Sequence, residues 1–303
     1  MTKLSSKQAK WELALTCLSG AYSTATIKGY RADFRAFEEW CLERAEVTLP
    51  SDVKTVCSFI EAQGKIKSPA TVKRRIFAIR KIHSLLSLPD PTRDEKIKTS
   101  IRRVFRGKAI RPKQAKGLSR HALKQFCEIQ PDSLIGLRNR AMLHLGYELL
   151  NRRSELVALR DEDLEEDSDG TLRVLIRRSK ADPYGIGRIG FTSKETSKLI
   201  GEWIEKRGPN IDWLFCPIYK NRACNRDLKP AAVKNIIKHA AKKSGESPDT
   251  ILDYSGHSLR VGAAQHLLMQ GFDTAAIMRA GGWKSISTLA RYLEKAEHNV
   301  WKS

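Results

Sequence analysis

The sequence of 303 residues contains no apolar run approaching the roughly 20 residues that a bilayer-spanning helix needs. Residues 1–10 are polar and lack the apolar core of a secretory signal peptide. These two absences predict a soluble protein that remains in the compartment where it is made, and a cytoplasmic location is the expectation.

Cysteine is scarce and shows no pattern. The six cysteines form no C-x-x-C pair, and no group of cysteine and histidine has the spacing of a zinc site. Most have apolar or aromatic neighbours, as Cys127 has in Phe126, which is typical of small core residues. No acidic cluster has the pattern of a magnesium site. The sequence predicts neither a disulfide scaffold nor a metal cofactor, and it favours a reducing compartment.

Acidic residues are outnumbered, since 34 Asp and Glu stand against 55 Lys and Arg, a formal net charge of +21. Residues 1–110 contain 22 basic and 11 acidic side chains, so the excess is spread over the chain and is no mere tail. Such a charge favours a polyanion, of which nucleic acid is the commonest. Charge that merely keeps a protein soluble, or that holds it at a membrane surface, is the alternative on composition alone.

The residue pattern divides the chain into two parts. Residues 1–108 combine capping serines with apolar residues three or four apart, which predicts helices only, and we interpret them as a helical core DNA-binding domain. Residues 109–117 are basic, contain Pro112 and lack an apolar period, as a linker lying against phosphate would. Residues 118–303 begin with a helix capped by Ser119 and form the second domain, which the motifs below indicate is catalytic.

The second part contains the expected strands. Apolar alternation predicts strands at 171–178 and near 187–191, joined by a turn at 182–185. Residues 136–159 are expected to form one long apolar helix, and helices dominate again from Ser193. The expected fold class is therefore mainly α with a small antiparallel β-sheet in two domains, and the family resemblance described below implies that these two domains form a clamp around DNA.

A helix expected at 69–86 has one apolar face and one basic face. Ser68 and Pro69 give a strong start signal, a capping serine followed by proline at the first helical position. A basic helix face is suited to the major groove of DNA. The candidate DNA contacts on it are Lys73, Arg74, Arg80 and Lys81.

Two stretches in the middle of the chain are suited to phosphate chemistry, although each has an ordinary explanation. Arg152 comes late in the expected apolar helix and is followed by Glu155, so its guanidinium needs an anion there. A cation that complements a helix end is the ordinary explanation. Lys180 stands at the tip of the expected hairpin, where a lysine can reach into a site, but most turn lysines are merely solvated.

Two further stretches lie closer to the C-terminal end. His257 and Arg260 are three residues apart at an expected helix start, so they face the same way. Trp283 follows two glycines that end a helix, and Tyr292 stands nine residues later on the last expected helix. Core packing is the ordinary explanation for a helical tyrosine.

Taken together, these residues resemble the tyrosine recombinase (phage integrase-type) family and look closest to its Cre-like subgroup. The resemblance extends over nearly the whole chain and is strongest from Gly256 to Tyr292, where the spacing follows the subgroup without a gap. An ordered set of six is far more specific than any one member. The resemblance implies a catalytic set, with Glu155 as a carboxylate that orients it: Arg152, Lys180, His257, Arg260, Trp283 and Tyr292.

The resemblance implies a site-specific DNA recombinase that cleaves and rejoins strands through a 3′-phosphotyrosyl intermediate, with no metal or ATP. Two guanidinium groups suit the charge of a five-coordinate phosphorus. A tyrosine of ordinary pKa about 10 needs such neighbours to attack at neutral pH, and Lys180 can protonate the departing 5′ oxygen. The implied partners are double-stranded DNA with inverted-repeat half-sites, a homodimer on each site and a homotetramer in the synapse.

The sequence departs from the family pattern in two places. Only residues 293–303 follow Tyr292, whereas Cre-like proteins carry a longer tail that docks into a neighbouring subunit, so tail exchange is open. Asn151 precedes Arg152 where the family often has an apolar residue. Two alternatives stay open: a type IB topoisomerase-like DNA relaxing enzyme, and a DNA-binding protein that has lost catalysis.

Overall fold

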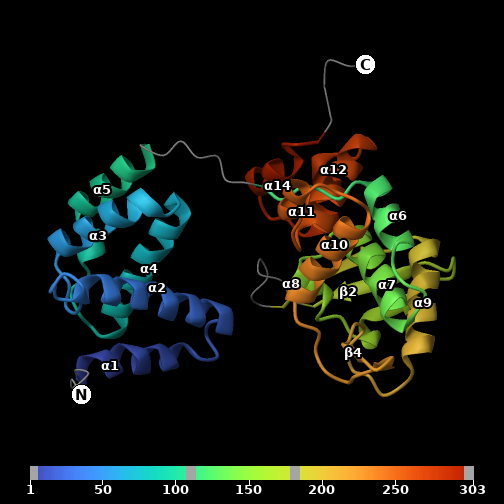
Figure 1. Cartoon of the computed structure of the whole chain (residues 1–303), viewed down its shortest axis with the longest axis horizontal. Coiled ribbons are helices and arrows are strands. Elements are labelled where there is room, and N and C mark those ends of the chain that lie inside the picture. The colour runs from blue at the N-terminus through green and yellow to red at the C-terminus, as the bar shows by residue number, and fades with distance from the viewer. Residues whose placement is uncertain (1–5, 107–113, 178–184, 297–303) are drawn as a thin grey trace, which may run out of the picture. The chain divides into compact units, whose positions relative to one another are not determined.

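The computed structural model of the chain describes residues 6–106, 114–177 and 185–296 (Figure 1). It divides into two compact units, Met1–Pro112 and Lys113–Ser303. Within the described ranges, no helix has both the length and the apolar character that crossing a bilayer requires.

The first unit is built from α-helices and short 3-10 turns over its described residues, as the sequence predicts. An aromatic cluster fills its core, where Phe59 meets Phe37 and Trp40 edge-on with ring centroids 4.9 and 5.4 Å apart. The elements are α1 (Ser6–Ala14), η1 (Leu15–Leu18), α2 (Thr24–Leu42), α3 (Val53–Ile66), α4 (Pro69–Leu85), η2 (Pro91–Arg93) and α5 (Glu95–Arg106).

The start of α4 follows the sequence signal, because the Ser68 hydroxyl accepts the backbone N–H of Thr71. The start of α3 is capped by an aspartate although a serine stands beside it. Asp52 caps this helix and accepts the N–H of Thr55 at 2.7 Å. Ser51 is buried, and its own N–H donates to the His83 ring, so it lies one residue too early to cap.

The second unit packs helices around a three-stranded antiparallel sheet of order β1-β2-β3. Figure 1 shows α6, α7 and α9 side by side, with α12 and α14 together nearer the C-terminal end. The fold class is mainly α with a small antiparallel sheet, as predicted. The elements are α6 (Arg120–Glu128), α7 (Leu134–Glu148), α8 (Arg153–Leu156), η3 (Asp161–Asp163), β1 (Leu164–Glu166), β2 (Leu172–Ile176), β3 (Arg188–Phe191), α9 (Lys194–Arg207), β4 (Ile218–Tyr219), β5 (Arg222–Ala223), α10 (Ala231–Lys243), α11 (Pro248–Asp253), α12 (Ser258–Met269), α13 (Thr274–Gly281) and α14 (Ile286–Leu293).

The expectation of one helix over 136–159 is wrong. Helix α7 ends at Glu148, and Leu150 takes a left-handed backbone conformation with φ of 49°, which no helix continues through. Arg152 then stands just before α8. Leu149 and Leu150 are buried in the turn that follows α7. The apolar sequence pattern therefore continues through this turn, and the end of the helix cannot be recognised from it.

Part of the predicted linker packs onto the second unit, while residues 109–113 lie outside the described ranges. The backbone N–H of Lys116 donates to the Asp253 carbonyl at 3.0 Å. Its ammonium group lies 5.3 Å from the centre of the Tyr254 ring and 3.9 Å from the Glu246 carboxylate. Lys116 is therefore bound by residues of its own unit, so its ammonium group is not free to contact phosphate.

Candidate active site and DNA interface

Five of the six predicted catalytic side chains come from three separate parts of the second unit, and four of them lie around the guanidinium group of the fifth. Lys180, the sixth, lies outside the described residues. The guanidinium belongs to Arg260 on α12, which is completely buried. The carbon at its centre lies 3.8 Å from the centre of the Trp283 ring and 5.7 Å from that of Tyr292.

Arg260 has more hydrogen-bond donors than the described protein satisfies. One terminal nitrogen donates to the carbonyl of Leu150, in the turn after α7. The Nε and Nη2 groups are buried and have no hydrogen-bond partner among the described residues. Burial and, next, the charge of Arg152 lower the pKa of Arg260 to about 10, so it remains a cation at neutral pH.

Arg152 is held in place by Glu155, three residues further on. One carboxylate oxygen accepts from the Arg152 guanidinium at 2.5 Å, and the other accepts the Arg152 backbone N–H at 3.0 Å. The Glu155 side chain is 1% exposed, whereas that of Arg152 is 18% exposed. The carboxylate thus fixes the guanidinium from beneath and leaves an edge of it open to an anion.

His257 stands at the N-terminal end of α12, one turn before Arg260, and reaches the surface. Desolvation by the surrounding protein lowers its pKa, and the positive charges of Arg153, Arg260 and Arg152 lower it further. A neutral imidazole is therefore favoured in the folded protein at pH 7. Ser258 is the first residue of α12 and does not cap it, because its hydroxyl accepts the backbone N–H of Ser255.

Trp283 and Tyr292 lie on either side of a tight turn and meet edge-on. Helix α13 ends with Gly282 in the left-handed region at φ of 66°, which returns the chain over Arg260. The two rings have centroids 5.1 Å apart with an interplanar angle of 70°. The indole N–H of Trp283 is buried without a partner among the described residues, a further unused donor beside Arg260.

Two glutamines that the sequence patterns do not single out hold the backbone of Tyr292. The side-chain amides of Gln114 and Gln265 donate to the Tyr292 carbonyl at 3.2 and 3.0 Å. Gln114 belongs to the predicted linker and Gln265 lies on α12, so no local pattern connects them to Tyr292. Both amides fix the end of α14 relative to α12.

The candidate DNA contacts on α4 differ in what their side chains already touch. Arg74 makes two hydrogen bonds, of 2.5 and 2.8 Å, to the buried carboxylate of Asp33, which raises the pKa of Arg74. The Lys81 ammonium donates to the Tyr22 hydroxyl at 3.0 Å. Both side chains therefore have partners within their own unit.

Lys73 and Arg80 flank an exposed aromatic ring on the outer face of α4. Phe77 is 44% exposed, and the charged groups of Lys73 and Arg80 lie 6.0 and 5.6 Å from the centre of its ring. The three residues share one helix face because they are four and three positions apart. This stripe of two cations around a ring is suited to the charged backbone and the apolar edges of DNA.

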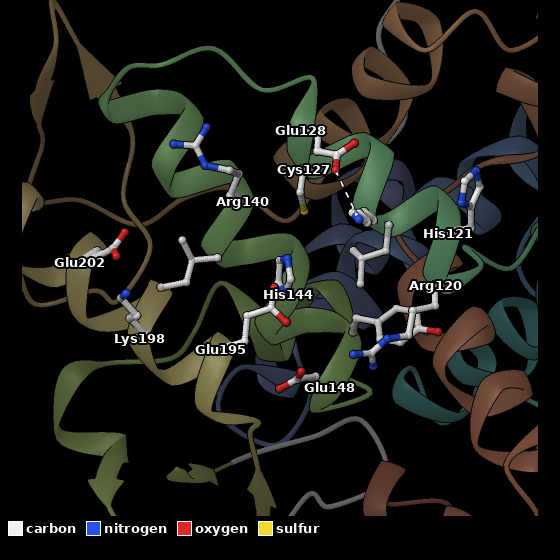
Figure 2. A pocket seen from close by; sticks show the side chains of 14 residues that line it. Arg120, His121, Cys127, Glu128, Arg140, His144, Glu148, Glu195, Lys198 and Glu202 are labelled. Carbon is white, nitrogen blue, oxygen red and sulfur yellow. Dashed lines mark ion pairs between the residues drawn. The ribbon is translucent and has the colours of Figure 1, made fainter. Parts of the chain in front are cut away.

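A cavity of about 630 Å³ lies elsewhere in the second unit, among α6, α7 and α9 (Figure 2). It contains none of the predicted catalytic residues. Its lining balances four carboxylates with four cations, so it carries no excess of positive charge for phosphate: Glu128, Glu148, Glu195 and Glu202, with Arg120, Lys124, Arg140 and Lys198. Among the residues that the structure describes, no three His, Cys, Asp or Glu side chains are grouped so as to hold a metal ion. The cluster around Arg260 is therefore the better candidate for DNA chemistry.

Comparison with known proteins identifies the class. The model of the phage integrase family matches residues 111–299, and the chain belongs to this family. The prediction of a tyrosine recombinase is thereby confirmed.

Among curated relatives, the recombinase Cre of Escherichia phage P1 is 26% identical over 297 residues, covering 91% of this chain and 86% of Cre. The integrase/recombinase XerD homologue of Selenomonas ruminantium is also 26% identical, over 292 residues, covering 91% of this chain and 83% of the homologue. Because the two identities are equal, the Cre-like subgroup is supported only loosely.

Solved structures share the fold. The XerH site-specific recombinase bound to a difH substrate, in a pre-cleavage complex, has a TM-score of 0.65 at 19% identity, covering 96% of this chain and 87% of that one. The Tn1549 transposon integrase in complex with circular intermediate DNA also has a TM-score of 0.65, at 14% identity, covering 96% of this chain and 95% of that one.

Proposed function

We propose that the protein is a site-specific DNA recombinase that cleaves a strand with Tyr292, keeps the 3′ end as a phosphotyrosine and rejoins it to a new 5′ end. The observation that carries this proposal is the buried guanidinium of Arg260, whose Nε and Nη2 lack partners among the described residues beside Tyr292. A buried cation with unused donors is costly unless an anion completes its shell. The scissile phosphate is that anion.

The other residues take the roles that their surroundings support. Arg152, oriented by Glu155, contacts a second non-bridging oxygen, and the two guanidinium groups offset the charge that grows on phosphorus. The phenolic oxygen of Tyr292 bonds to phosphorus while the bond to the 5′ oxygen breaks. Neutral His257 accepts the phenolic proton, and Lys180 protonates the departing oxygen.

Trp283 donates its indole N–H to the phosphate and packs on Arg260. Because Arg260 is completely buried under the rings of Trp283 and Tyr292, we infer that phosphate entry requires both rings to shift. Exchange of one ester for another conserves the phosphodiester bond energy, so rejoining needs no ATP. The paired guanidinium groups supply the charge neutralisation for which other enzymes use a metal.

The wider assembly follows from the same proposal. Residues 1–108 form the core DNA-binding domain, 109–117 the linker and 118–303 the catalytic domain, which together close on double-stranded DNA in the cytoplasm. The major groove is read by α4 through Lys73, Phe77 and Arg80, with Arg74 and Lys81 as further contacts. Arg74, Arg80 and Lys81 each also have a partner within their own unit. One homodimer occupies each pair of inverted half-sites, and a homotetramer forms the synapse.

A nicked duplex tests the proposal, once the DNA that the protein protects has supplied the target sequence. Cleavage beside the nick releases a short fragment that diffuses away, so a covalent protein–DNA adduct accumulates. We expect this adduct in chelator and without ATP, attached at Tyr292 when the peptide is mapped. A DNA-binding protein without catalysis gives no adduct. A topoisomerase IB-like enzyme relaxes supercoiled plasmids that lack the target sequence, and that result would overturn site-specific recombination.

The depressed pKa of His257 predicts a pH profile. Because this pKa is below the ordinary value of 6.5, the neutral imidazole persists as the pH falls past 6.5 and is lost only as the pH falls through the lower folded value. The rate constant of adduct formation is expected to stay level from pH 8 through 6.5 and to fall only as the pH drops through the lower folded pKa of His257. In His257→Asn the acid limb of the profile disappears. An identical limb in this variant would assign the titration to another group.

The stripe on α4 predicts a salt effect on binding. In the double variant Lys73→Ala, Arg80→Ala, the slope of log binding constant against log salt concentration is expected to become shallower by about 0.9 for each phosphate that is no longer neutralised. Lys98→Ala is the control, because this exposed lysine of α5 pairs with Glu95 on its own helix. Fluorescence anisotropy at several salt concentrations measures the slope. A double variant with the wild-type slope would show that α4 does not face the DNA.

A further inference from the structure

Arg188 lies at the start of β3, and its side chain is buried in the second unit to 13% exposure. Its residue pairs with Ile176 of β2, so the sheet fixes its backbone. The sequence patterns assign it no role, and nothing in its local sequence distinguishes it from the chain's other arginines.

The guanidinium group of Arg188 connects the two halves of the candidate active site. On one side, Nη2 donates to the Leu149 carbonyl at 2.8 Å and to the Asn151 side-chain oxygen at 2.7 Å. This is the turn that leads directly into Arg152. On the other side, Nη1 donates to the Ala280 carbonyl at 2.7 Å, at the end of the helix that precedes Trp283.

Arg188 also reaches the carboxylate that orients Arg152. Its Nη2 lies 3.7 Å from Oε2 of Glu155, while the other oxygen of Glu155 accepts from the Arg152 guanidinium. Glu155 is thus shared between the two arginines. Any movement of Arg188 changes the field and the geometry in which Glu155 holds Arg152.

The end of α13 packs directly on the Arg188 side chain. A Cβ atom added to Gly282 would lie 2.8 Å from Cδ and 3.1 Å from Nε of Arg188, so only glycine allows this approach. The same turn sets the direction of Trp283, which covers Arg260. Two carbonyls, a side-chain amide and a close glycine therefore fix Arg188 between elements far apart in sequence.

We propose that Arg188 is a positioning residue for strand cleavage: it holds the turn carrying Arg152 at a set distance from the turn carrying Trp283, so that phosphate and Tyr292 meet in line. This rests on the proposed function. Both terminal nitrogens of Arg188 donate to protein oxygens, and its buried Nε, which has no partner among the described residues, faces Gly282. Arg188 therefore acts through these neighbours rather than on the phosphate. The pair of carbonyls it bridges cannot be joined by a lysine, whose single ammonium lacks the planar fork.

The test separates binding from chemistry in Arg188→Lys and Arg188→Ala. With saturating protein on the nicked duplex, the first-order rate of adduct formation is expected to fall about 10- to 100-fold, as a misplacement near 1 Å does. The dissociation constant for DNA is expected to stay within about twofold, and the loss of rate should be smaller in Arg188→Lys. Arg173→Lys on the adjacent strand β2 is the matched control, since its 41% exposed side chain pairs only with Glu165 and Asp167 at the surface among the described residues.

Each outcome decides. A wild-type rate in Arg188→Lys and in Arg188→Ala overturns the positioning role, and so does an equal loss of binding and rate. Because Arg188→Ala leaves buried carbonyls unpaired, its thermal midpoint of unfolding is measured. If the alanine variant is unfolded, the rate of Arg188→Lys alone tests the positioning role. If both unfold, Arg188 is a general structural residue and the proposal fails. A wild-type protein that forms no adduct at Tyr292 would instead refute the proposed function, which the same gel reveals.

Discussion

In Tyr292→Phe, adduct formation on the nicked duplex is expected to fall by at least about 10,000-fold, to the limit of detection, because loss of a covalent nucleophile removes the reaction path. Phenylalanine keeps the ring that packs 5.1 Å from Trp283 and 5.7 Å from Arg260, so the change removes little beyond the hydroxyl group. Denaturing gel electrophoresis of the labelled DNA measures the adduct.

Tyr219→Phe is the matched control for this variant. Tyr219 lies on β4 and is 66% exposed, so its hydroxyl is removed without change at the site. Both variants are expected to bind DNA as the wild type does. Adduct formation by Tyr292→Phe at more than a trace would assign the nucleophile to another residue and would contradict the proposed mechanism.

The second large effect is expected in Arg260→Lys, where the cleavage rate should fall by about 100- to 1,000-fold, the loss typical of one preorganised donor to a transition-state oxygen. Lysine keeps the charge but presents all its donors from one nitrogen, so it does not reproduce the planar geometry in which Nη1 meets the Leu150 carbonyl while Nε and Nη2 remain for phosphate. It also cannot stack as a plane on the Trp283 ring, which lies 3.8 Å from the centre of the guanidinium.

Because Arg260 is completely buried, stability must be measured beside the rate. A folded Arg260→Lys protein with the far-ultraviolet circular dichroism of the wild type and a strongly reduced rate supports a direct role on the phosphate. Arg173→Lys serves as control here too. A folded variant that cleaves at the wild-type rate would remove Arg260 from the site.

The sequence was sufficient to predict the fold class and the set of residues around Arg260. Both predictions rest on the order and spacing of residue types along the chain. Their spacing predicts that His257 and Arg260 lie together at the start of a helix, and the two glycines before Trp283 predict the turn that ends the preceding helix. The tyrosine recombinase class followed from the ordered set, whereas the catalytic role of each member remains a prediction.

What the sequence concealed are interactions between distant elements. The break at Leu150 interrupts an apolar pattern without changing it, because the turn residues are as buried as the helix before them. The sequence patterns do not single out Phe77, and it is 44% exposed between two cations. The hydrogen bonds of Arg188 go to the carbonyls of residues 149 and 280, which are distant in sequence and meet Arg188 only in the folded chain. No local sequence pattern could therefore predict its position.

The hydrogen bond from Gln114 to the Tyr292 carbonyl has a practical consequence for dissecting the chain. A catalytic fragment that began at Leu118, where the helical pattern suggests a clean boundary, would leave that carbonyl with Gln265 as its one remaining amide donor of the two described. The end of the last described helix would then lose one of its two described amide tethers, although Leu289 stays buried. Low activity in such a fragment would combine the missing tether with the missing first unit, so comparisons between the whole chain and its catalytic part should start the fragment ahead of Gln114.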